Sequence, residues 1–334
     1  MGEFVQFSVN GLMTGALYAL IAAGIVAVYK STRVVNFAHG HIIMLGAYLF
    51  YTFVVLMPRA SWVPDWYRNW KPEWLAELAA AAQPFSMDSA IVSWVGAMPR
   101  IAVALIAAVV LNAIIGIVIE RLFLRPLTGH STFSMIMVTI GLISVLDGVV
   151  SLLWAADADY VPYLGPHGAI WFEAFGTQIF VFGSSLTNFA IAVVLFAAIL
   201  TFFYLTPAGV AFRATAEDPA AASSMGINVP RIFSATWALA CATGAVAGAI
   251  LATRNGVTPA LSGFGFVVLA IVLMGGLDSF AGCAIAALTI GWLEGMTQWR
   301  LGGDYADILP YASVLIVILI RPHGLMGQAT VDRV

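Results

Sequence analysis

Charged residues are scarce in this 334-residue sequence, at 9% of the chain, whereas soluble domains carry about 25%. Hydrophobic residues make up 61%, and the mean hydropathy is +0.96. A soluble fold of this length could not bury so much apolar surface, so the surrounding solvent must be lipid. The net charge of −3 and the scattered placement of the 14 Lys and Arg argue against nucleic-acid binding.

Cysteine is also scarce, because only Cys241 and Cys283 are present and both lie in apolar segments. Two distant thiols make neither a disulfide framework nor a zinc site, so we interpret them as small apolar residues in helix interfaces. The sequence also lacks a P-loop, a dinucleotide-binding glycine loop, a Ser/His/Asp set and an HExxH motif. We therefore expect no enzyme, no bound cofactor and no metal in this chain.

Long apolar runs dominate the sequence, and a membrane-spanning helix needs about 20 mostly apolar residues. The runs predict an all-α polytopic membrane protein, a single domain over 1–334 with eight to ten spanning or half-spanning helices. We expect these helices near residues 4–29, 37–57, 99–120, 132–156, 186–206, 231–254, 262–277, 280–300 and 306–321. The seventh and ninth runs are short for a full crossing, so we expect one or more to be broken or re-entrant.

The basic residues predict an orientation. No basic residue precedes the first apolar run, and Lys30 and Arg33 follow it, which is not the pattern of a cleaved signal peptide. The positive-inside rule then places the N-terminus outside and the C-terminus inside. Successive spanning helices place their connecting loops on alternating sides of the membrane. The basic residues on the inner side are then Lys30, Arg33, Arg121, Arg125, Arg213, Arg231, Arg321 and Arg333.

Two long segments are expected outside. Residues 58–98 are rich in Trp and Pro, which predicts a cap of short amphipathic helices at the membrane interface, or alternatively a docking site for an external protein. Residues 157–185 are rich in Gly, Pro and aromatic side chains, and we expect them to be ordered but irregular.

The inner loop 207–230 carries local signals for one short helix. Asp218 suits the N-cap, Pro219 the first helical position and Gly226 the position after the C-cap, so a helix is expected over about 219–225. Its residues are small on every face, which allows another surface to approach closely. The loop is therefore predicted to face a partner, and an ordinary surface connector is the alternative.

Several polar residues fall within apolar runs, where each is costly unless it is buried in protein or lines water. Asn36 and His39 would share one face of the second helix. We expect them to form either a hydrogen-bond network at the end of the helix or part of a gate. Asp147, in the fourth run, is a candidate for a role in the translocation path or its gate. Alternatively, its carboxyl group is protonated or forms a hydrogen bond with a nearby group. Asn112 is a similar but neutral candidate.

Small residues mark close helix contacts and one break. Gly244 and Gly248 have small-xxx-small spacing in the sixth run. Gly275, Gly276 and Gly282 interrupt the apolar sequence and allow a tight turn or a half-helix.

Four motifs in order carry a family resemblance. They are NFAHG within an opening stretch of residues 11–48, FRATAEDPAAASSMGIN at 212–228, VLMGGLDSFAG at 272–282 and RPHGLMG at 321–327. Through them nearly the whole chain resembles the permease subunits of bacterial ABC importers for branched-chain amino acids.

The resemblance implies a permease in the bacterial inner membrane that carries branched-chain amino acids or related small amides and organic acids. It implies three kinds of partner besides lipid: two cytoplasmic subunits that bind ATP and Mg²⁺, a second related permease or a second copy, and a periplasmic substrate-binding protein. The inner loop would then be the coupling helix that contacts an ATPase, through Arg213, Glu217, Asp218, Pro219, Ala221 and Gly226. The N-terminal motif matches at Asn36, Phe37, Ala38, His39 and Gly40.

Two rival functions belong to other classes. One is a secondary transporter driven by an ion gradient, with Asp147 as the coupling site. The other is a membrane-embedded enzyme, which is disfavoured because the polar residues do not converge in number.

Overall fold

The computed structural model describes residues 2–59, 89–127, 129–155, 159–166, 168–174, 177–321 and 323–327. Its helices are α1 (Gly2–Thr32), α2 (His39–Tyr51), α5 (Ser89–Ile119), α6 (Thr132–Trp154), α7 (Gly183–Leu205), α8 (Pro207–Glu217), α9 (Pro219–Ser224), α10 (Val229–Asn255), α11 (Phe264–Gly275), α12 (Phe280–Arg300), α13 (Gly303–Ala306) and α14 (Leu309–Ile320). Helical turns extend α2 to Arg59 and α5 to Leu127, and a 3₁₀ turn, η6 (Pro259–Gly263), precedes α11. Eight described helical segments are long and apolar enough to cross a membrane, which confirms the expected polytopic all-α bundle.

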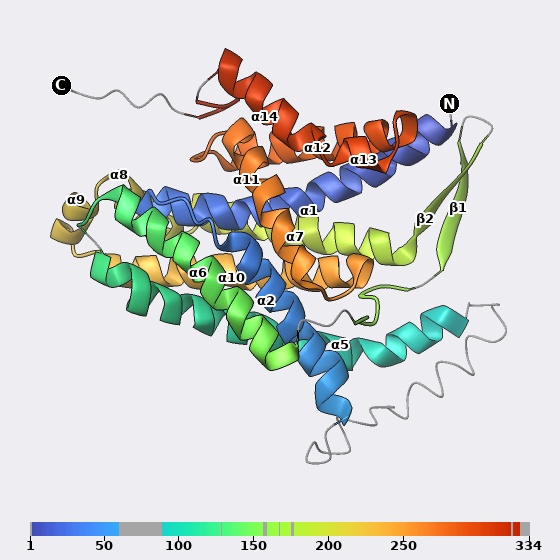
Figure 1. Ribbon diagram of the computed structural model, residues 1–334, viewed down its shortest axis with the longest axis horizontal. Coiled ribbons are helices and arrows are strands. Elements are labelled where there is room, and N and C mark those ends of the chain that lie inside the picture. Colours follow the sequence, from blue (N-terminus) through green and yellow to red (C-terminus); the bar gives the residue numbers. More distant parts are fainter. Residues whose placement is uncertain are drawn as a thin grey trace.

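The long helices lie side by side, and the bundle has two distinct ends (Figure 1). We call one the α9 end, because α8 and α9 project there between the end of α7 and the start of α10. We call the other the hairpin end. There the strands β1 (Ala169–Ala174) and β2 (Thr177–Phe182) form an antiparallel hairpin, and the Gln6 side chain bonds both backbone groups of Phe180 at 2.8 and 2.9 Å.

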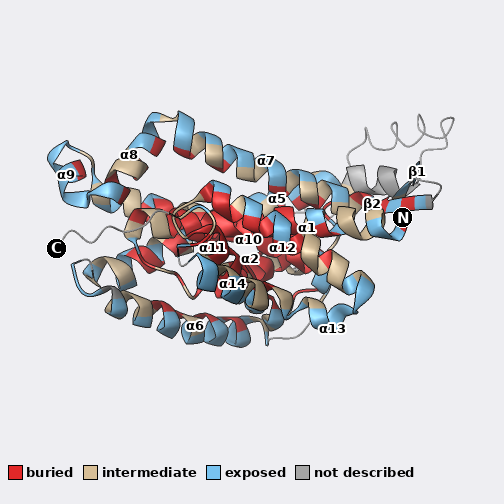
Figure 2. Cartoon of the chain, turned by 90° about the horizontal axis from the view of Figure 1, so that it is seen from above, coloured by how far each residue is buried: buried red, intermediate tan, exposed pale blue. Residues whose placement is uncertain are grey.

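The inner and outer helices differ in burial in a way that indicates lipid as the solvent. The apolar windows of α1, α2 and α10 are 72–83% buried, whereas those of α5, α6 and α7 are 28% buried or less (Figure 2). The outer helices are nevertheless the more apolar set, and they expose Ile106, Leu152 and Val194. Water would penalise such a surface, whereas a hydrocarbon solvent does not.

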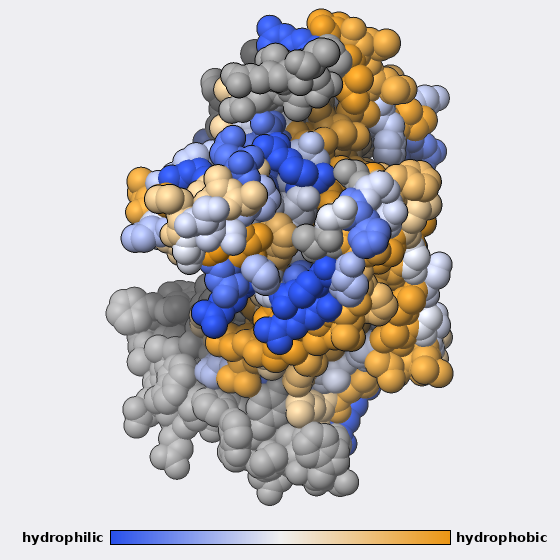
Figure 3. Space-filling model, turned by 90° about the vertical axis from the view of Figure 1, so that its left-hand side faces the viewer, coloured by the Kyte–Doolittle hydropathy of each residue, from blue (hydrophilic) through white to orange (hydrophobic). Residues whose placement is uncertain are grey.

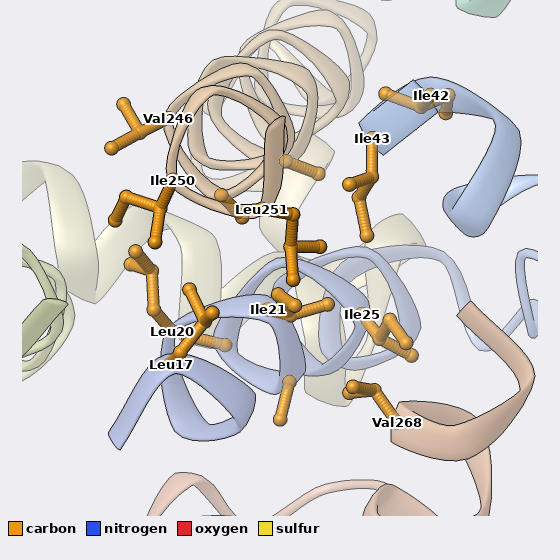
Figure 4. Close-up of a cluster of buried hydrophobic side chains, with 14 of the residues drawn as sticks. Leu17, Leu20, Ile21, Ile25, Ile42, Ile43, Val246, Ile250, Leu251 and Val268 are labelled. Carbon is orange, nitrogen blue, oxygen red and sulfur yellow. The ribbon is translucent and has the colours of Figure 1, made fainter. Parts of the chain in front are cut away.

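The core is formed where α1 crosses α10, α2 and α11. Ile21 and Ile25 of α1 pack toward Leu251 of α10, Ile43 of α2 and Val268 of α11 (Figure 4).

Glycines let α1 and α12 approach at backbone distance. A Cβ atom on Gly11 would lie 2.5 Å from the carbonyl oxygen of Gly291, and one on Gly15 would lie 2.7 Å from that of Ala287. Gly11/Gly15 and Gly291/Gly295 share the four-residue spacing of close helix pairs, a signal that our sequence analysis overlooked.

One helix boundary differs from expectation. Helix α5 begins at Ser89 rather than near residue 99, and Pro99 lies inside it, where it removes one backbone hydrogen bond without ending the helix. Residues 60–88 of the expected outer cap, 58–98, lie outside the described residues.

The expectation of irregular structure over 157–185 is wrong for residues 169–174 and 177–182, which form β1 and β2. Ile170 pairs with Val181 and Trp171 with Phe180, so β-branched and aromatic side chains face one another across the hairpin. Because the segment is rich in Gly and aromatic residues, its composition indicated a loop, and the two strands were not predicted.

The chain breaks between α11 and α12 at Gly276. Helix α11 has 12 residues, or about 18 Å at 1.5 Å per residue, which is too short to cross a bilayer of about 30 Å. Its C-cap is Gly276 with φ +106°, and α12 starts four residues later. Helix α14 also has 12 residues, but together with α13 it forms an apolar segment of 18 residues.

Candidate functional site

The short helix expected in the inner loop is present as α9, and side-chain and backbone caps define both its ends. The Asp218 carboxylate accepts hydrogen bonds from the amides of Ala220 and Ala221 at 2.8 and 3.0 Å, and Pro219 occupies the first helical position. These bonds satisfy two of the amides that every helix N-terminus leaves free.

The end of α9 is a Schellman motif. The amide of Ile227 donates to the carbonyl of Ala222, and the amide of Gly226 donates to that of Ser223, both at 3.0 Å. Gly226 has φ +85°, a left-handed conformation that costs a residue with a Cβ about 1–2 kcal/mol. The turn from α9 to α10 is therefore fixed by its backbone.

Helix α9 presents a small, solvent-facing surface. Ala221, Ser223 and Ser224 are exposed, Ala222 faces the protein with 4% exposure, and Met225 is 84% exposed beside them. Figure 3 looks onto this end and shows hydrophilic residues gathered in the middle of the face, with hydrophobic residues beside them. The arrangement offers an accessible, sterically open contact surface.

Helix α8 connects α9 to the bundle. The Arg213 guanidinium donates to the carbonyl of Phe203 and lies 5.9 Å from the ring of Tyr204. The ring of Phe203 packs on Phe212 of α8 at 5.4 Å and on Phe280, the first residue of α12, at 4.9 Å. Glu217 is exposed in the last turn of α8, and Asp218 serves as C-cap of α8 and N-cap of α9.

A second connection, which our sequence analysis did not anticipate, joins the start of α10 to α5. Glu120 is 2% exposed and forms a bidentate pair with Arg125 at 2.8 and 3.1 Å. Arg125 also donates to the carbonyl of Pro230 and to the hydroxyl of Ser234, at 3.2 and 2.7 Å. The closely spaced Glu and Arg were a local signal, but nothing in the sequence pointed to α10.

The N-terminal motif forms the turn into α2 and lies deep in the protein. The Asn36 side chain accepts a bond from the amide of Ala38 at 3.0 Å, while Phe37 is half-buried. His39 is 1% exposed, and its ring packs against Gly24 of α1. A Cβ on Gly40 would overlap the carbonyl oxygen of Ser262.

Asn112 and Asp147 both contact the first turn of α2, but they differ in character. Asn112 is fully buried and donates to the carbonyls of Ile42 and Cys241 at 3.3 and 2.8 Å, so it joins α5 to α2 and α10. The Asp147 side chain is half exposed on α6 and pairs with His41 at 3.4 Å. His41 is a partner that the sequence analysis did not predict.

The predicted packing glycines differ in how closely other segments approach them. A Cβ on Gly248 would overlap the carbonyl oxygen of Ile43, and one on Gly282 would overlap that of Gly275, whereas at Gly244 the closest atom, of Ile42, is 3.3 Å away. Gly276 combines a positive φ with close contact to Gly327. The terminal motif therefore packs directly on the break between α11 and α12.

A cavity of about 1190 Å³ opens at the hairpin end. It is lined by α1, the start of α7, the end of α10, the first turn of α11 and the end of α12. In it Tyr18 donates a hydrogen bond to Glu294 at 3.0 Å, and Arg254 lies near Thr14 at 3.4 Å. The sequence analysis predicted no role for Glu294.

Comparisons with known proteins agree on one family. The model described as "Branched-chain amino acid transport system / permease component" matches residues 7–319. The chain is 29% identical to the high-affinity branched-chain amino acid transport system permease protein LivH of Salmonella typhimurium, over 99% of this chain and 98% of that protein. It is 26% identical to BraD of Pseudomonas aeruginosa, described in the same words, with the same coverage.

A shorter match involves the permease protein LivM of Salmonella typhimurium, which is 32% identical over 36% of this chain and 28% of that protein. No solved structure matches the chain.

Proposed function

This chain belongs to the family of permease components of branched-chain amino acid transport systems, and from that premise we propose how its structure takes part in ATP-driven import. It is a multi-pass membrane protein and a transporter subunit rather than an enzyme. In the proposed assembly it forms half of the translocation path, and two cytoplasmic subunits bind ATP and Mg²⁺.

One observation carries the proposal: α9 is exposed, capped at both ends and rigidly connected to the bundle. Its surface residues are small, so a groove of an ATPase subunit can close around it. Because Asp218 caps both α8 and α9, a displacement of α9 is passed to α8 and from there through Phe203 and Phe280 to α12. Through Pro230 and Arg125 it is passed to α5.

We assign the α9 end to the cytoplasmic side of the inner membrane. Lys30 lies at this end and donates to the carbonyl of Asp278 at 3.1 Å, beside the break on which the terminal motif packs. Arg125 and Arg213 lie at the same end. Arg254 and Arg300 lie at the hairpin end. The positive-inside rule then supports an outside N-terminus and an inside C-terminus.

Two further partners complete the proposal. The partial match to LivM supports pairing with a second, related permease, and a second copy of this chain is the alternative. A periplasmic binding protein would deliver substrate at the hairpin end. The names of the relatives support branched-chain amino acids as the substrate.

A double substitution, Asp218→Lys with Gly226→Trp, tests the coupling role. It removes the N-cap and fills the exit turn, and both positions are exposed, so the bundle should still fold. We expect the ATPase subunits to be lost from the purified complex and ATP-driven leucine uptake into proteoliposomes to fall to background. Retained ATPase binding would contradict the proposal.

Asp147→Asn separates this function from gradient-driven transport. Asp147 is half exposed, pairs with His41 and is not among the residues that line the cavity. We expect uptake by Asp147→Asn to remain within about threefold of the unmodified transporter and to stay dependent on ATP. Uptake that follows a proton or sodium gradient and collapses in Asp147→Asn would favour a secondary transporter.

A further inference from the structure

The cavity at the hairpin end lies on the side of the bundle away from α9. The chain leaves α7 and enters α10 through α8 and α9, whereas the cavity is lined by the opposite ends of both helices. From α7 these are Ser184, Ser185 and Asn188, and from α10 Ile250 and Arg254. Under the proposed orientation, the cavity opens toward the compartment from which substrate is delivered.

Polar groups inside the cavity include a well-defined hydrogen-bond acceptor. Tyr18 is 5% exposed and donates to Oε2 of Glu294, which fixes the carboxylate from one side. Asn188 lines the same cavity, is 7% exposed, and its side-chain oxygen is buried with no hydrogen-bond partner among the described residues. Leaving a buried acceptor unpaired is unfavourable, and a bound hydrogen-bond donor would offset that cost.

The cavity carries more negative than positive charge. Glu294, Asp304 and Asp307 contribute carboxylates, and Arg254 contributes the cation among the lining residues. A ligand with an ammonium group and a carboxylate matches this set, whereas an organic acid without the ammonium group would meet net repulsion.

The walls beside these charges are apolar. Leu17, Phe264 and Val267 line the cavity together with the polar set, so an aliphatic side chain can be buried next to the charged groups. The residue after Phe264 is Gly265, whose backbone packs on Gly40 of the N-terminal motif. The cavity wall is therefore continuous with the segment that leads into α2.

We propose that this cavity is a substrate-binding site on the outer part of the translocation path, where Glu294, held by Tyr18, receives the ammonium group of an apolar amino acid and Arg254 its carboxylate. This inference rests on the proposed import function. It assigns Glu294 and Tyr18 a role in recognition, in addition to their packing between α1 and α12.

Uptake measurements test the site in the complete transporter. We compare Glu294→Gln with Glu3→Gln, because the exposed Glu3 accepts a hydrogen bond from Trp299 near the same end but does not line the cavity. Loss of a charged hydrogen-bond acceptor should lower leucine uptake about tenfold in Glu294→Gln, and Tyr18→Phe should lower it less. ATPase association and ATP hydrolysis stimulated by the binding protein should be unchanged. Equal uptake in Glu294→Gln and Glu3→Gln would overturn the site.

A labelling experiment measures ligand binding without transport. Cys241 and Cys283 are buried, so Ser185→Cys would provide the reactive thiol in the cavity, with Glu173→Cys, on the exposed hairpin strand β1 and outside the cavity lining, as control. Leucine should slow the reaction of Ser185→Cys with a membrane-impermeant maleimide, whereas 4-methylpentanoate, which lacks the ammonium group, should not. The protection should disappear when Glu294→Gln is added. Equal protection by both compounds, or by neither, would overturn the site.

The two experiments separate this inference from the function on which it rests. If the unmodified complex imports no leucine with ATP, the import function fails whatever the labelling shows. If import is normal but Glu294→Gln has no effect and leucine gives no protection, the import function stands and the cavity site fails.

Discussion

The α9 end and the hairpin end of the bundle are built by different means. At the α9 end, a few adjacent residues set the structure: Asp218, Pro219 and Gly226 determine where one exposed helix starts and stops. At the hairpin end, groups from distant parts of the chain converge, as when Tyr18 bonds Glu294 across 276 residues. The first arrangement suits contact with a partner, and the second encloses a space.

The difference implies that the two ends can be disabled separately. Changes in the caps of α9 should impair coupling and leave the cavity intact, and changes in the cavity should do the reverse. Changes in the packed centre between the two ends should destroy both.

The largest effect is expected from Gly40→Val in that centre. The new side chain would overlap the backbone at Ser262, and backbone cannot rotate away as a side chain can. Overpacking a core lowers the free energy of unfolding by about 1–3 kcal/mol. Because the overlap is with backbone, we expect the loss for Gly40→Val to reach or exceed the upper end of this range. Purified protein should be aggregated or strongly lowered in Tm. Gly141→Val is the control, because no atom lies within 4 Å of a Cβ at Gly141, and its Tm should be nearly unchanged.

The next largest effect is expected from Arg125→Ala, which breaks the connection between α5 and α10. It leaves Glu120 buried with an unpaired charge, a change that costs about 3–5 kcal/mol when both partners are buried. The Arg125 side chain is 39% exposed, so we expect about 2 kcal/mol. Adding Glu120→Gln should restore part of the stability measured by thermal unfolding. No recovery in the double variant would show that the lost stability does not come from the unpaired charge.

A smaller and more local effect is expected from Asp218→Ala. Loss of an N-cap costs about 1 kcal/mol, which should fray α9 and leave the Tm of the bundle almost unchanged. ATPase binding, measured by titration of the purified subunits, should weaken several-fold. Asp218→Asn keeps an equally good cap and should bind normally, and a defect as large as that of Asp218→Ala would instead implicate the charge.

The smallest effect is expected where the residues after α6 meet α2 and α10. Asp159 pairs with Val257 in an isolated bridge, and its carboxylate accepts a hydrogen bond from Tyr51, which lowers the pKa of Asp159 below its usual value of 3.8. A lowered folded-state pKa contributes stability at pH values above 3.8, and this contribution is lost as the pH falls through the folded pKa. Tyr51→Phe should therefore lower the Tm slightly at pH 7 and by less near pH 3. A difference that grows on acidification would contradict this assignment.

The sequence predicted the features that depend on neighbouring residues. The caps of α9, the break at Gly276 and the close packing at Gly248 each follow from a signal a few residues long. The apolar runs predicted the bundle because lipid requires long apolar helices whatever their partners.

Features that depend on tertiary contact were not predicted. The partner of Asp147 is His41, more than 100 residues away, and the pairing of Glu294 depends on how α1 crosses α12. The pairing of Ile170 with Val181 was not predicted, because the composition of this segment suggested a loop. Such contacts arise from packing, and no periodicity in the sequence encodes them.

The central claim is that α9 passes the movement of the ATPase subunits to the bundle, and cross-linking tests it most directly. Ala221→Cys places a thiol on the exposed face of α9, and Ala222→Cys places one on the buried face one residue later, with both native cysteines buried. In inside-out vesicles, a short bismaleimide should join Ala221→Cys to a cysteine introduced into the facing groove of an ATPase subunit, with a yield that changes when ATP is added, while Ala222→Cys should remain unlinked. Reaction of Ala221→Cys with an impermeant reagent outside intact cells, or a cross-link yield unaffected by ATP, would contradict the account.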